Sequence, residues 1–332
     1  MAKGKKLHDA ERYAVLAAVY GREGTQVNHE QVGAYRTKTV KAGEFLYVAC
    51  YPLIGSTQKR EQDKALAMLE QEKRKGRLIG YARYNNKRRV REFEQLVHTN
   101  FGKNDLHIAC TYGDMEYSPE FGMADAANRP HRDREDAKRD VRNYINRVKR
   151  LLKRNGCDLA EFRWVAVTVT KRYDQEARRP YPDAHHHHLL MHGVPEALRG
   201  EVERLWPYGY CNADRIQPDD KGIAAIANYV ARQEGSANGC HAPGEKSYTG
   251  SRNLKKPTVT TSDSRISRRR VAQIAADVRG NAWEVFGKVY PGYRLVEQPV
   301  VQLSDFVSGA YVYAKLRIRE RDAYGKGKGK LV

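Results

Sequence analysis

The chain has 332 residues, of which 40% are hydrophobic and 30% charged, a composition typical of a globular protein with a real core. Its 60 lysines and arginines outnumber its 40 aspartates and glutamates. The resulting formal charge of +20 favours a polyanionic partner, and nucleic acid is the usual one. No apolar stretch approaches the roughly 20 residues of a membrane helix, and no apolar core follows the basic start. We therefore expect a cytoplasmic protein with no membrane partner and no secretory signal.

Five cysteines are spread along the chain without a Cys-x-x-Cys pair. This spacing argues against a zinc finger and against a disulfide framework, so we expect reduced thiols, several of them in the core. They are Cys50, Cys110, Cys157, Cys211 and Cys240.

The predicted elements begin after a polar extension over residues 1–32. Two β-rich runs in Tyr35–Ile54 are broken at Lys41-Ala42-Gly43, which predicts a hairpin. Helical patterns follow over Lys59–Lys75 and Asn85–Phe101.

Strands and helices then alternate from Leu106 to Gln233. Apolar residues at i, i+3 and i+4 predict a helix over Arg134–Asn155, with Gly156 in the position of a C-terminal cap. The order is strand, helix, strand, strand, helix, strand, helix. It predicts an α+β fold with an antiparallel central sheet and helices on one face. The other elements are expected over Leu106–Thr111, Phe162–Thr170, the histidine run to Met191, Pro195–Trp206, Tyr210–Pro218 and Asp220–Gln233.

These patterns divide the chain into four regions. After the extension over 1–32, an α/β segment over 33–104 is expected to pack on the central domain at 105–258. A basic region over 259–332 follows, which contains "RISRRR" and ends in "GKGKGKLV".

Four consecutive histidines, His185 to His188, stand at the start of an apolar run. Alternate side chains of a strand share a face, so His186 and His188 are expected to point one way and His185 and His187 the other. Buried imidazoles without partners would cost about 1–3 kcal/mol each, which favours a function over a solvated loop. Two imidazoles on one face can hold a divalent ion when a third ligand comes from elsewhere.

A second candidate lies on the helix expected over Asp220–Gln233. Tyr229 lies about 110° from the centre of the buried stripe, and Arg232 lies about 60° further round. The two residues can present a phenol and a guanidinium to one ligand, although a tyrosine at the edge of a core is common. The stripe itself is formed by Ile223, Ile226, Ala227 and Val230.

Four short motifs follow one another along the chain. They are HIACTY at His107–Tyr112, HHHLLM at His186–Met191, YVAR at Tyr229–Arg232 and YTGSRNLKKP at Tyr248–Pro257. In this order they resemble rolling-circle replication initiators of the HUH endonuclease superfamily, most closely the replication-associated proteins grouped with the filamentous-phage gene II protein. The resemblance covers most of Tyr35 to Pro257. It carries family roles over to Thr111, Tyr112, His186, His188, Tyr229 and Arg232.

The resemblance implies an HUH palm that nicks single-stranded DNA. His186 and His188 would hold a divalent ion, Mg²⁺ or Mn²⁺ rather than zinc, which would polarise the scissile phosphate. Tyr229 would attack phosphorus and give a 5′-phosphotyrosine link with a free 3′-OH. A phenol with an ordinary pKa near 10 is a poor nucleophile at neutral pH, so Arg232 and the ion would favour its phenolate.

Three positions depart from the family pattern. The strand Val165–Thr170 carries no glutamate, which leaves the third metal ligand open among Asp114, Glu176 and Asp183. Arg232 replaces a lysine, which keeps the charge but changes its geometry and hydration. Gln233 stands where two-tyrosine members have a second tyrosine, so we expect one nucleophile per protomer. Rejoining would then need a second protomer or direct attack by the 3′-OH.

Basic residues near and after the last motif are expected to hold the phosphate backbone, with an affinity that falls as salt rises. They are Arg252, Lys255, Lys256, Arg265, Arg268, Arg269 and Arg270. The sequence has no GxxxxGK[ST] motif for a fused helicase. The expected partners are therefore single-stranded DNA at a replication origin, a host helicase and polymerase, with homodimerisation left open.

Other functions fit parts of the pattern. A relaxase or a single-strand transposase would share the chemistry, but the motif order and the Ser-Arg-Asn-Leu-Lys-Lys-Pro segment favour replication initiation. A non-catalytic DNA-binding protein with a structural metal would keep all its properties after Tyr229→Phe. An RNA-binding protein would prefer RNA to single-stranded DNA in competition.

Overall fold

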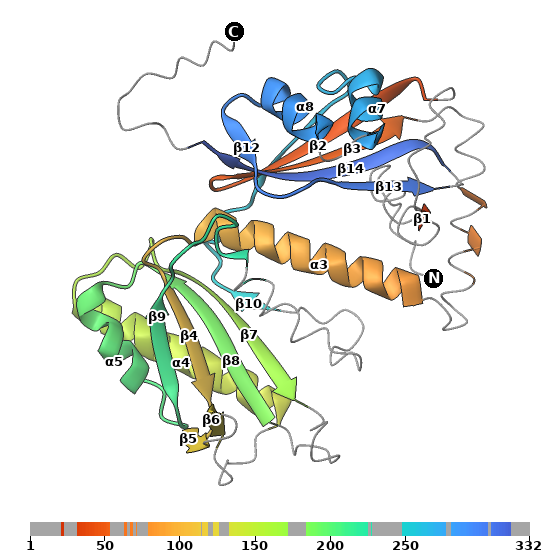
Figure 1. The fold of residues 1–332 in the computed structure, drawn as a ribbon. Helices are drawn as coiled ribbons and strands as arrows, with labels where there is room; N and C mark the ends of the chain where they lie inside the picture. Colours follow the sequence, from red (N-terminus) through yellow and green to blue (C-terminus); the bar gives the residue numbers. More distant parts are fainter. Residues whose placement is uncertain are drawn as a thin grey trace, which may run out of the picture. The chain divides into compact units, whose positions relative to one another are not determined.

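A computed structural model describes residues 21–22, 32–53, 63–64, 67–68, 71, 79–113, 115–118, 122–125, 133–171, 184–224, 227, 248–276, 280–304 and 307–319. The chain divides into two compact units, one of Met1–Arg91 with Pro257–Val332 and one of Glu92–Lys256. Figure 1 shows a sheet in each unit. Among the described residues, no helix combines the length and the apolar character needed to cross a membrane.

The first unit is built on an antiparallel sheet whose described strands run in the order β1–β13–β14–β3–β2–β11, with β12 also paired to β14. Ala42 pairs with Phe45 in the expected hairpin of β2 and β3, and Gly43 in its two-residue turn has a φ of 57°. Glycine adopts positive φ without a steric cost, which suits so tight a turn. The strands are β1 Gly21–Arg22, β2 Ala34–Ala42, β3 Phe45–Leu53, β11 Thr258–Ser262, β12 Tyr293–Leu295, β13 Val300–Ser304 and β14 Val307–Ile318.

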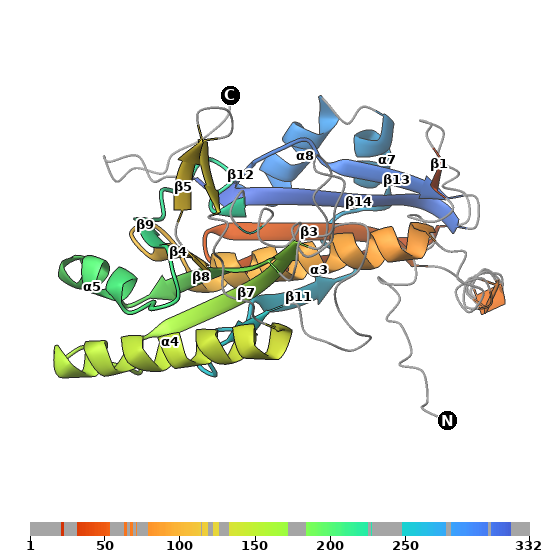
Figure 2. The same ribbon diagram turned by 90° about the horizontal axis from the view of Figure 1, so that it is seen from below.

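Helices α7 (Arg268–Ala276) and α8 (Asn281–Val289) lie along one face of this sheet (Figures 1 and 2). Val271 and Phe286 from these helices share a buried core with Val312 of β14. Burial of these side chains against the sheet supplies the main driving force for docking the two short helices.

The second unit contains, in its described part, a five-stranded antiparallel sheet in the order β10–β7–β8–β4–β9. Helices α4 (Arg134–Arg154) and α5 (Arg199–Arg204) cover one face, and a 3₁₀ turn over Glu196–Leu198 precedes α5. The strands are β4 Leu106–Thr111, β7 Arg163–Lys171, β8 Ala184–His192, β9 Cys211–Arg215 and β10 Thr249–Gly250. A separate hairpin of β5 Met115–Ser118 and β6 Gly122–Asp125 follows β4, and α3 (Ile79–Asn100) contains the boundary between the units.

Helix α4 forms where the apolar spacing predicts it. The side chain of Asp133 caps its start by accepting a hydrogen bond from the Asp136 backbone N–H at 2.7 Å. Gly156, with a φ of 71°, follows its end in the left-handed conformation. Its buried side facing the sheet consists of Ala137, Asp140, Val141, Tyr144, Ile145, Val148, Leu151 and Leu152.

The expected α+β fold, with an antiparallel sheet and helices on one face, is confirmed in this unit. The predicted order of elements is present from β4 to β9. The helix expected over Pro195–Trp206 is instead a 3₁₀ turn followed by a shorter α5. Of the helix expected over Lys59–Lys75, only residues 63–64, 67–68 and 71 are described, and these are helical. The β5–β6 hairpin was not predicted because four-residue strands carry little periodic signal.

The compact units join segments that the sequence-based regions kept apart. Strands from 33–104 and from 259–332 belong to one sheet, and β1 adds part of the 1–32 extension to its edge. The pairing of β3 with β14 places Cys50 opposite Val312. Local periodicity carries no information about a pairing between positions so distant in sequence.

The reactivity of the cysteines tests this packing. Burial raises the pKa of the Cys50 thiol to about 12, and Cys50 and Cys110 are both fully buried. Because the thiolate is the reactive form, iodoacetamide at neutral pH should modify the partly exposed Cys157 well before either of them. Mass spectrometry of peptides after timed alkylation measures this order. In urea the three thiols should react at similar rates, and rapid modification of Cys50 in the folded protein would contradict its buried position.

Candidate functional site on the five-stranded sheet

The histidine run forms strand β8, and its side chains alternate between the two faces of the sheet. Leu189 lies in the core shared with α4, so the two-residue period places His185 and His187 on the helix-covered face. His186 and His188 lie on the opposite face, with their ring centroids 5.2 Å apart. The sheet thus separates an inner pair, His185 and His187, from an outer pair, His186 and His188.

His187 of the inner pair stands in a buried chain of hydrogen bonds. Its Nε2 lies 3.1 Å from Tyr112 Oη, and its Nδ1 lies 3.0 Å from Thr168 Oγ1. Tyr112 Oη donates to Asp140 Oδ2 of α4 at 3.1 Å. Because the tyrosine proton goes to the carboxylate, His187 Nε2–H donates to Tyr112 and Nδ1 accepts from Thr168. Burial holds the pKa of His187 well below its usual value, which matches this neutral tautomer.

The outer pair meets a third histidine, His107 of β4. His107 Nε2 lies 3.3 Å from His188 Nδ1, and the two rings stack with centroids 5.5 Å apart. Burial lowers the pKa of His188 to about 3, and the neighbouring His186 and His107 add to the effect. Burial also lowers the pKa of His107, against an opposing effect from Asp214. His188 and His107 are therefore neutral at pH 7, and neutral imidazole is the form that binds metal ions.

Thr111 contributes an oxygen beside the outer pair. It is paired with His186 across β4 and β8, and directly opposed residues share a face of the sheet. Its Oγ1 is buried and has no hydrogen-bond partner among the residues that the structure describes. A buried hydroxyl left in this state costs free energy unless a ligand binds it. Two imidazoles and a buried hydroxyl on one face are a donor set that fits a divalent ion.

The described residues do not supply a complete set of metal ligands. Within them, no group of three or more His, Cys, Asp or Glu side chains is arranged to hold a metal. The carboxylates considered as a third ligand, Asp114, Glu176 and Asp183, all lie outside the described part of the chain.

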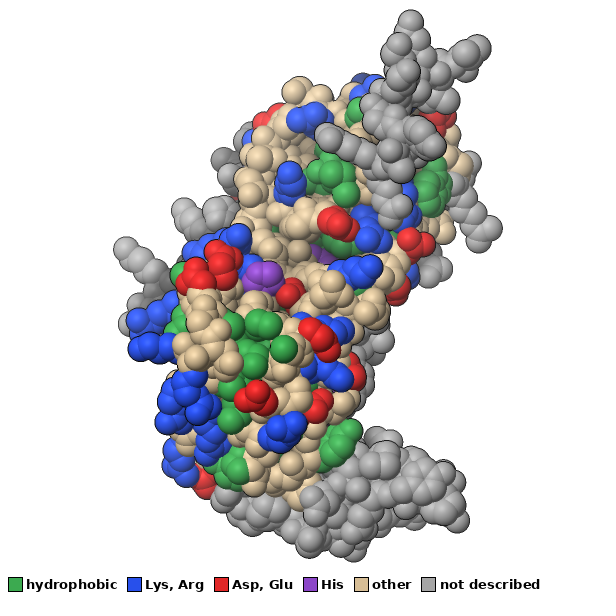
Figure 3. All heavy atoms as spheres, turned by 90° about the vertical axis from the view of Figure 1, so that its left-hand side faces the viewer, with side chains coloured by type: hydrophobic (Ala, Val, Ile, Leu, Met, Phe, Trp, Pro, Cys, Tyr) green, Lys and Arg blue, Asp and Glu red, His purple; other side chains and the backbone are tan. Residues whose placement is uncertain are grey.

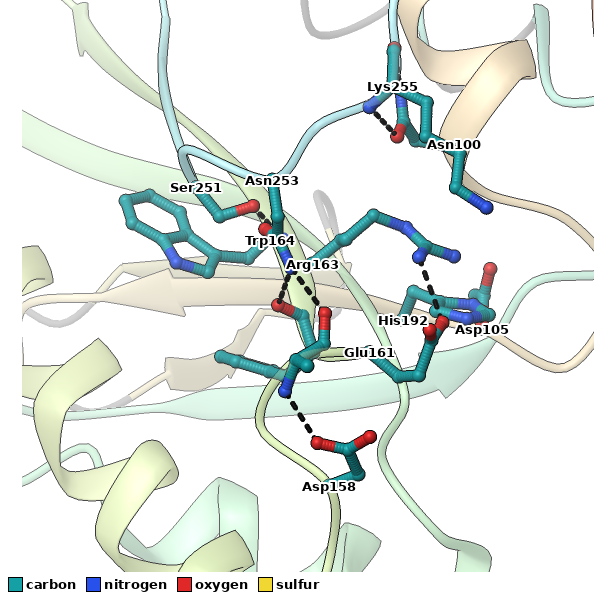
Figure 4. Close-up of polar contacts among 12 residues, drawn as sticks. Asn100, Asp105, Asp158, Glu161, Arg163, Trp164, His192, Ser251, Asn253 and Lys255 are labelled. Carbon is teal, nitrogen blue, oxygen red and sulfur yellow. Dashed lines mark hydrogen bonds and ion pairs between the residues drawn. The ribbon is translucent and has the colours of Figure 1, made fainter.

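The polar side chains after β10 fasten the chain to the edge of the sheet (Figure 4). Ser251 Oγ accepts the backbone N–H of Trp164 at 3.2 Å, and the Ser251 N–H donates to Trp164 O at 2.9 Å. Asn253 Nδ2 donates to the carbonyls of Ala160 and Phe162 at 2.7 and 3.1 Å. These two residues thus anchor the segment to both the start of β7 and the loop before it.

The far end of this segment is held by Asn100, the last residue of α3. Its Nδ2 donates to Lys255 O at 2.8 Å and its Oδ1 accepts the Lys255 N–H at 2.7 Å, so one amide clamps one peptide unit (Figure 4). The segment Thr249–Lys256 is termed the clip. Within the described residues, its strand β10 pairs only with β7, next to the histidine strand.

The structure separates the basic residues expected to bind DNA into two groups. The clip holds its backbone through polar residues and leaves the side chains of Arg252, Lys255 and Lys256 exposed. The other group is exposed on α7 in the first unit, where Arg268 Nη1 also donates to Val32 O at 3.1 Å. That group consists of Arg268, Arg269 and Arg270, and Arg265 is exposed just before the helix.

The expected nucleophile Tyr229 and its partner Arg232 lie outside the described residues. The described start of their segment agrees with the predicted helix, because the Ala227 N–H donates to Ile223 O at 3.0 Å and both residues are buried. The Ile223 N–H donates to His98 Nε2 at 3.2 Å, which ties this start to the end of α3.

Sequence reasoning missed His107 and the buried Asp140. The alternation of β4 places His107 on one face with Thr111, but its contact with His188 depends on the register between β4 and β8. Asp140 occupies a position on the apolar stripe of α4, and a carboxylate there signals a buried polar partner. Only the fold identifies that partner as Tyr112.

Comparison with models of known protein families, with curated proteins and with solved structures finds no match for this chain. Its residues and their geometry therefore carry the functional argument.

Replacing Tyr112 tests the buried hydrogen bonds that join Asp140, Tyr112, His187 and Thr168. Tyr112→Phe removes the donor to Asp140 and the acceptor for His187, so it should lower the free energy of unfolding by about 1–3 kcal/mol. Urea denaturation followed by circular dichroism measures the change. Tyr210→Phe, the same substitution at an exposed tyrosine, should stay within about 0.5 kcal/mol of wild type. Equal stabilities of the two variants would refute the role of the Tyr112 hydroxyl.

Proposed function

We propose that this chain is a site-specific DNA nickase of the HUH type, which cuts and rejoins a single strand to initiate rolling-circle replication of a phage or plasmid. The observation that carries the proposal is the outer pair. His186 and His188 lie together on one face of the sheet, beside the unpartnered hydroxyl of Thr111. The motif order along the sequence supplies the rest of the argument.

His186 and His188 would hold a divalent ion, Mg²⁺ or Mn²⁺, which when bound supplies positive charge to the scissile phosphate. The chain's own contribution is to place both imidazoles on one face of the sheet, with that of His188 neutral. Burial keeps the pKa of His188 low. The hydrogen bonds of His187 to Tyr112 and Thr168 fix the part of the strand from which both imidazoles project. Fixing the ligands before binding lowers the reorganisation required when the site is filled.

Tyr229 would act as the nucleophile. Its oxygen would form a bond to phosphorus while the bond from phosphorus to the 3′ oxygen breaks, and the phenolic proton would pass to the leaving 3′ oxygen. Arg232 would orient the phosphate and favour the phenolate. The 3′-OH would prime synthesis by a host polymerase behind a host helicase, and the phosphotyrosine would conserve the bond for rejoining, by a second protomer or by the 3′-OH.

The main experiment uses single-stranded oligonucleotides tiled across the replicon that encodes the protein. With Mn²⁺, wild type should form a protein–DNA adduct on one tile, visible on a denaturing gel. Tyr229→Phe and the double variant His186→Ala/His188→Ala should form none. The matched controls are Tyr210→Phe, at an exposed tyrosine, and His192→Ala, at the far end of the same strand. Both controls should keep the adduct.

The other outcomes separate the rival functions. Binding without an adduct on any tile would leave a non-catalytic DNA-binding protein. An adduct only on transfer-origin or transposon-end sequences would favour a relaxase or a transposase. Stronger binding of RNA than of single-stranded DNA in competition would reject the assignment to DNA.

The clip provides a separate test of strand binding. Substituting its exposed cations, as Arg252→Gln/Lys255→Gln/Lys256→Gln, leaves the backbone clamp of Asn100 intact. If each cation contacts a phosphate, the slope of log K against log salt for a single strand should fall by about 2. Fluorescence anisotropy at several salt concentrations measures this slope. The control Lys41→Gln/Lys103→Gln/Lys288→Gln removes the same charge elsewhere, and an equal effect would contradict a role specific to the clip.

A further inference from the structure

We propose that the exposed face of α4 is a second nucleic-acid surface, which binds the phosphate backbone of double-stranded DNA. The helix covers the inner face of the sheet, so this surface and the outer pair lie on opposite sides of the same unit. The proposal does not depend on the nicking chemistry.

The charge of this helix is concentrated and unbalanced. From Arg142 to Arg154 it carries six basic residues and no acidic one. In the described part of the chain none of the six pairs with a carboxylate; Arg147 instead donates to Leu205 O at 3.4 Å. The six are Arg142, Arg147, Lys149, Arg150, Lys153 and Arg154.

These cations repel one another within the helix. Arg150 has Lys153 and Arg154 at i+3 and i+4, and Lys149 has Lys153 at i+4, spacings at which like charges destabilise a helix. The first turns of α4 differ, because Lys138 there pairs with Glu135 at 2.8 Å. An ordinary solvated face has no need of such a cluster, whereas a polyanion on this face would relieve its repulsion.

Part of this cluster lines a hollow in the surface. Asn143, Asn146, Arg147, Lys149 and Arg150 line a shallow open hollow of about 640 Å³ along the helix. Amide and guanidinium groups side by side are donors of the kind that hold phosphate oxygens. Figure 3 shows a band of lysine and arginine side chains on the side of this unit where α4 lies.

The geometry favours a duplex over a single strand. The rise of a helix spaces Arg142 and Arg154 about 18 Å apart in a rigid row, which suits the regular phosphates of double-stranded DNA. Binding of single strands commonly relies on exposed aromatic side chains that stack on bases. Tyr144 is the sole aromatic residue of α4, and it is fully buried.

A pair of matched double variants tests the proposal. Lys149→Gln/Arg150→Gln removes two cations that have no carboxylate partner among the described residues. Lys138→Gln/Arg139→Gln removes a lysine and an arginine that pair with Glu135 and Asp136 on the same helix. Binding of a short fluorescent DNA duplex is measured by anisotropy against salt. The first variant should bind about ten-fold more weakly and lose about 1.8 from the salt slope. The second should match wild type.

Three results would overturn the proposal. Equal weakening of duplex binding by both variants would show only an effect of net charge. Unchanged duplex binding by Lys149→Gln/Arg150→Gln would show that this face of α4 does not bind the duplex. An equal loss of binding to a single strand of the same length would reject the assignment to a duplex. The assay involves no cleavage, so failure to nick in the tiling experiment would leave its result unaffected.

Discussion

The candidate site depends on the buried hydrogen-bond chain from Asp140 through Tyr112 and His187 to Thr168. A strand with four histidines has no apolar pattern at that end to fix its register, and a slip by one residue would exchange the two faces. In the observed register His187 bonds to both Tyr112 and Thr168, and Leu189 and Met191, which share its face of the strand, lie in the core. A buried polar chain of this kind stabilises a structure only when every member has its partner. With His187 on the helix-covered face, strand alternation places His186 and His188 on the opposite face.

The clip combines polar residues that anchor its backbone to the sheet with charged residues that are exposed. In the sequence Ser-Arg-Asn-Leu-Lys-Lys-Pro, Ser251 and Asn253 form hydrogen bonds with the edge of the sheet and the loop before it. Arg252 between them is exposed. The polar residues therefore give the segment a fixed backbone, and the charged residues are held out from it at low entropic cost. If the clip binds phosphate as proposed, a substitution of either type would weaken that binding, but only loss of an anchor would also loosen the edge of the sheet.

The sequence was sufficient where the controlling interactions are local. The strand over Leu106–Thr111, the helix from Arg134 and the alternation of the histidines all follow from periodicity and caps within one element. It was insufficient where the interaction joins distant segments. The contact of His107 with His188 needs the register of β4 with β8, and the pairing of Cys50 with Val312 needs the whole first unit to assemble. For the proposed nucleophile, the assignment comes from the sequence, because Tyr229 lies outside the described residues.

The basic residues of the second unit differ in whether acidic residues neutralise them. On the first turns of α4, cations are matched by Glu135 and Asp136 and contribute little beyond solubility. From Arg142 onward the same helix carries cations without acidic partners in the described chain, and the clip exposes three more. Under the proposed function, the protein would hold a single strand at its nucleophile while the adjoining DNA is still paired. Two separate basic surfaces on one small unit would meet that requirement better than one continuous patch, because each could match the geometry of its own form of DNA.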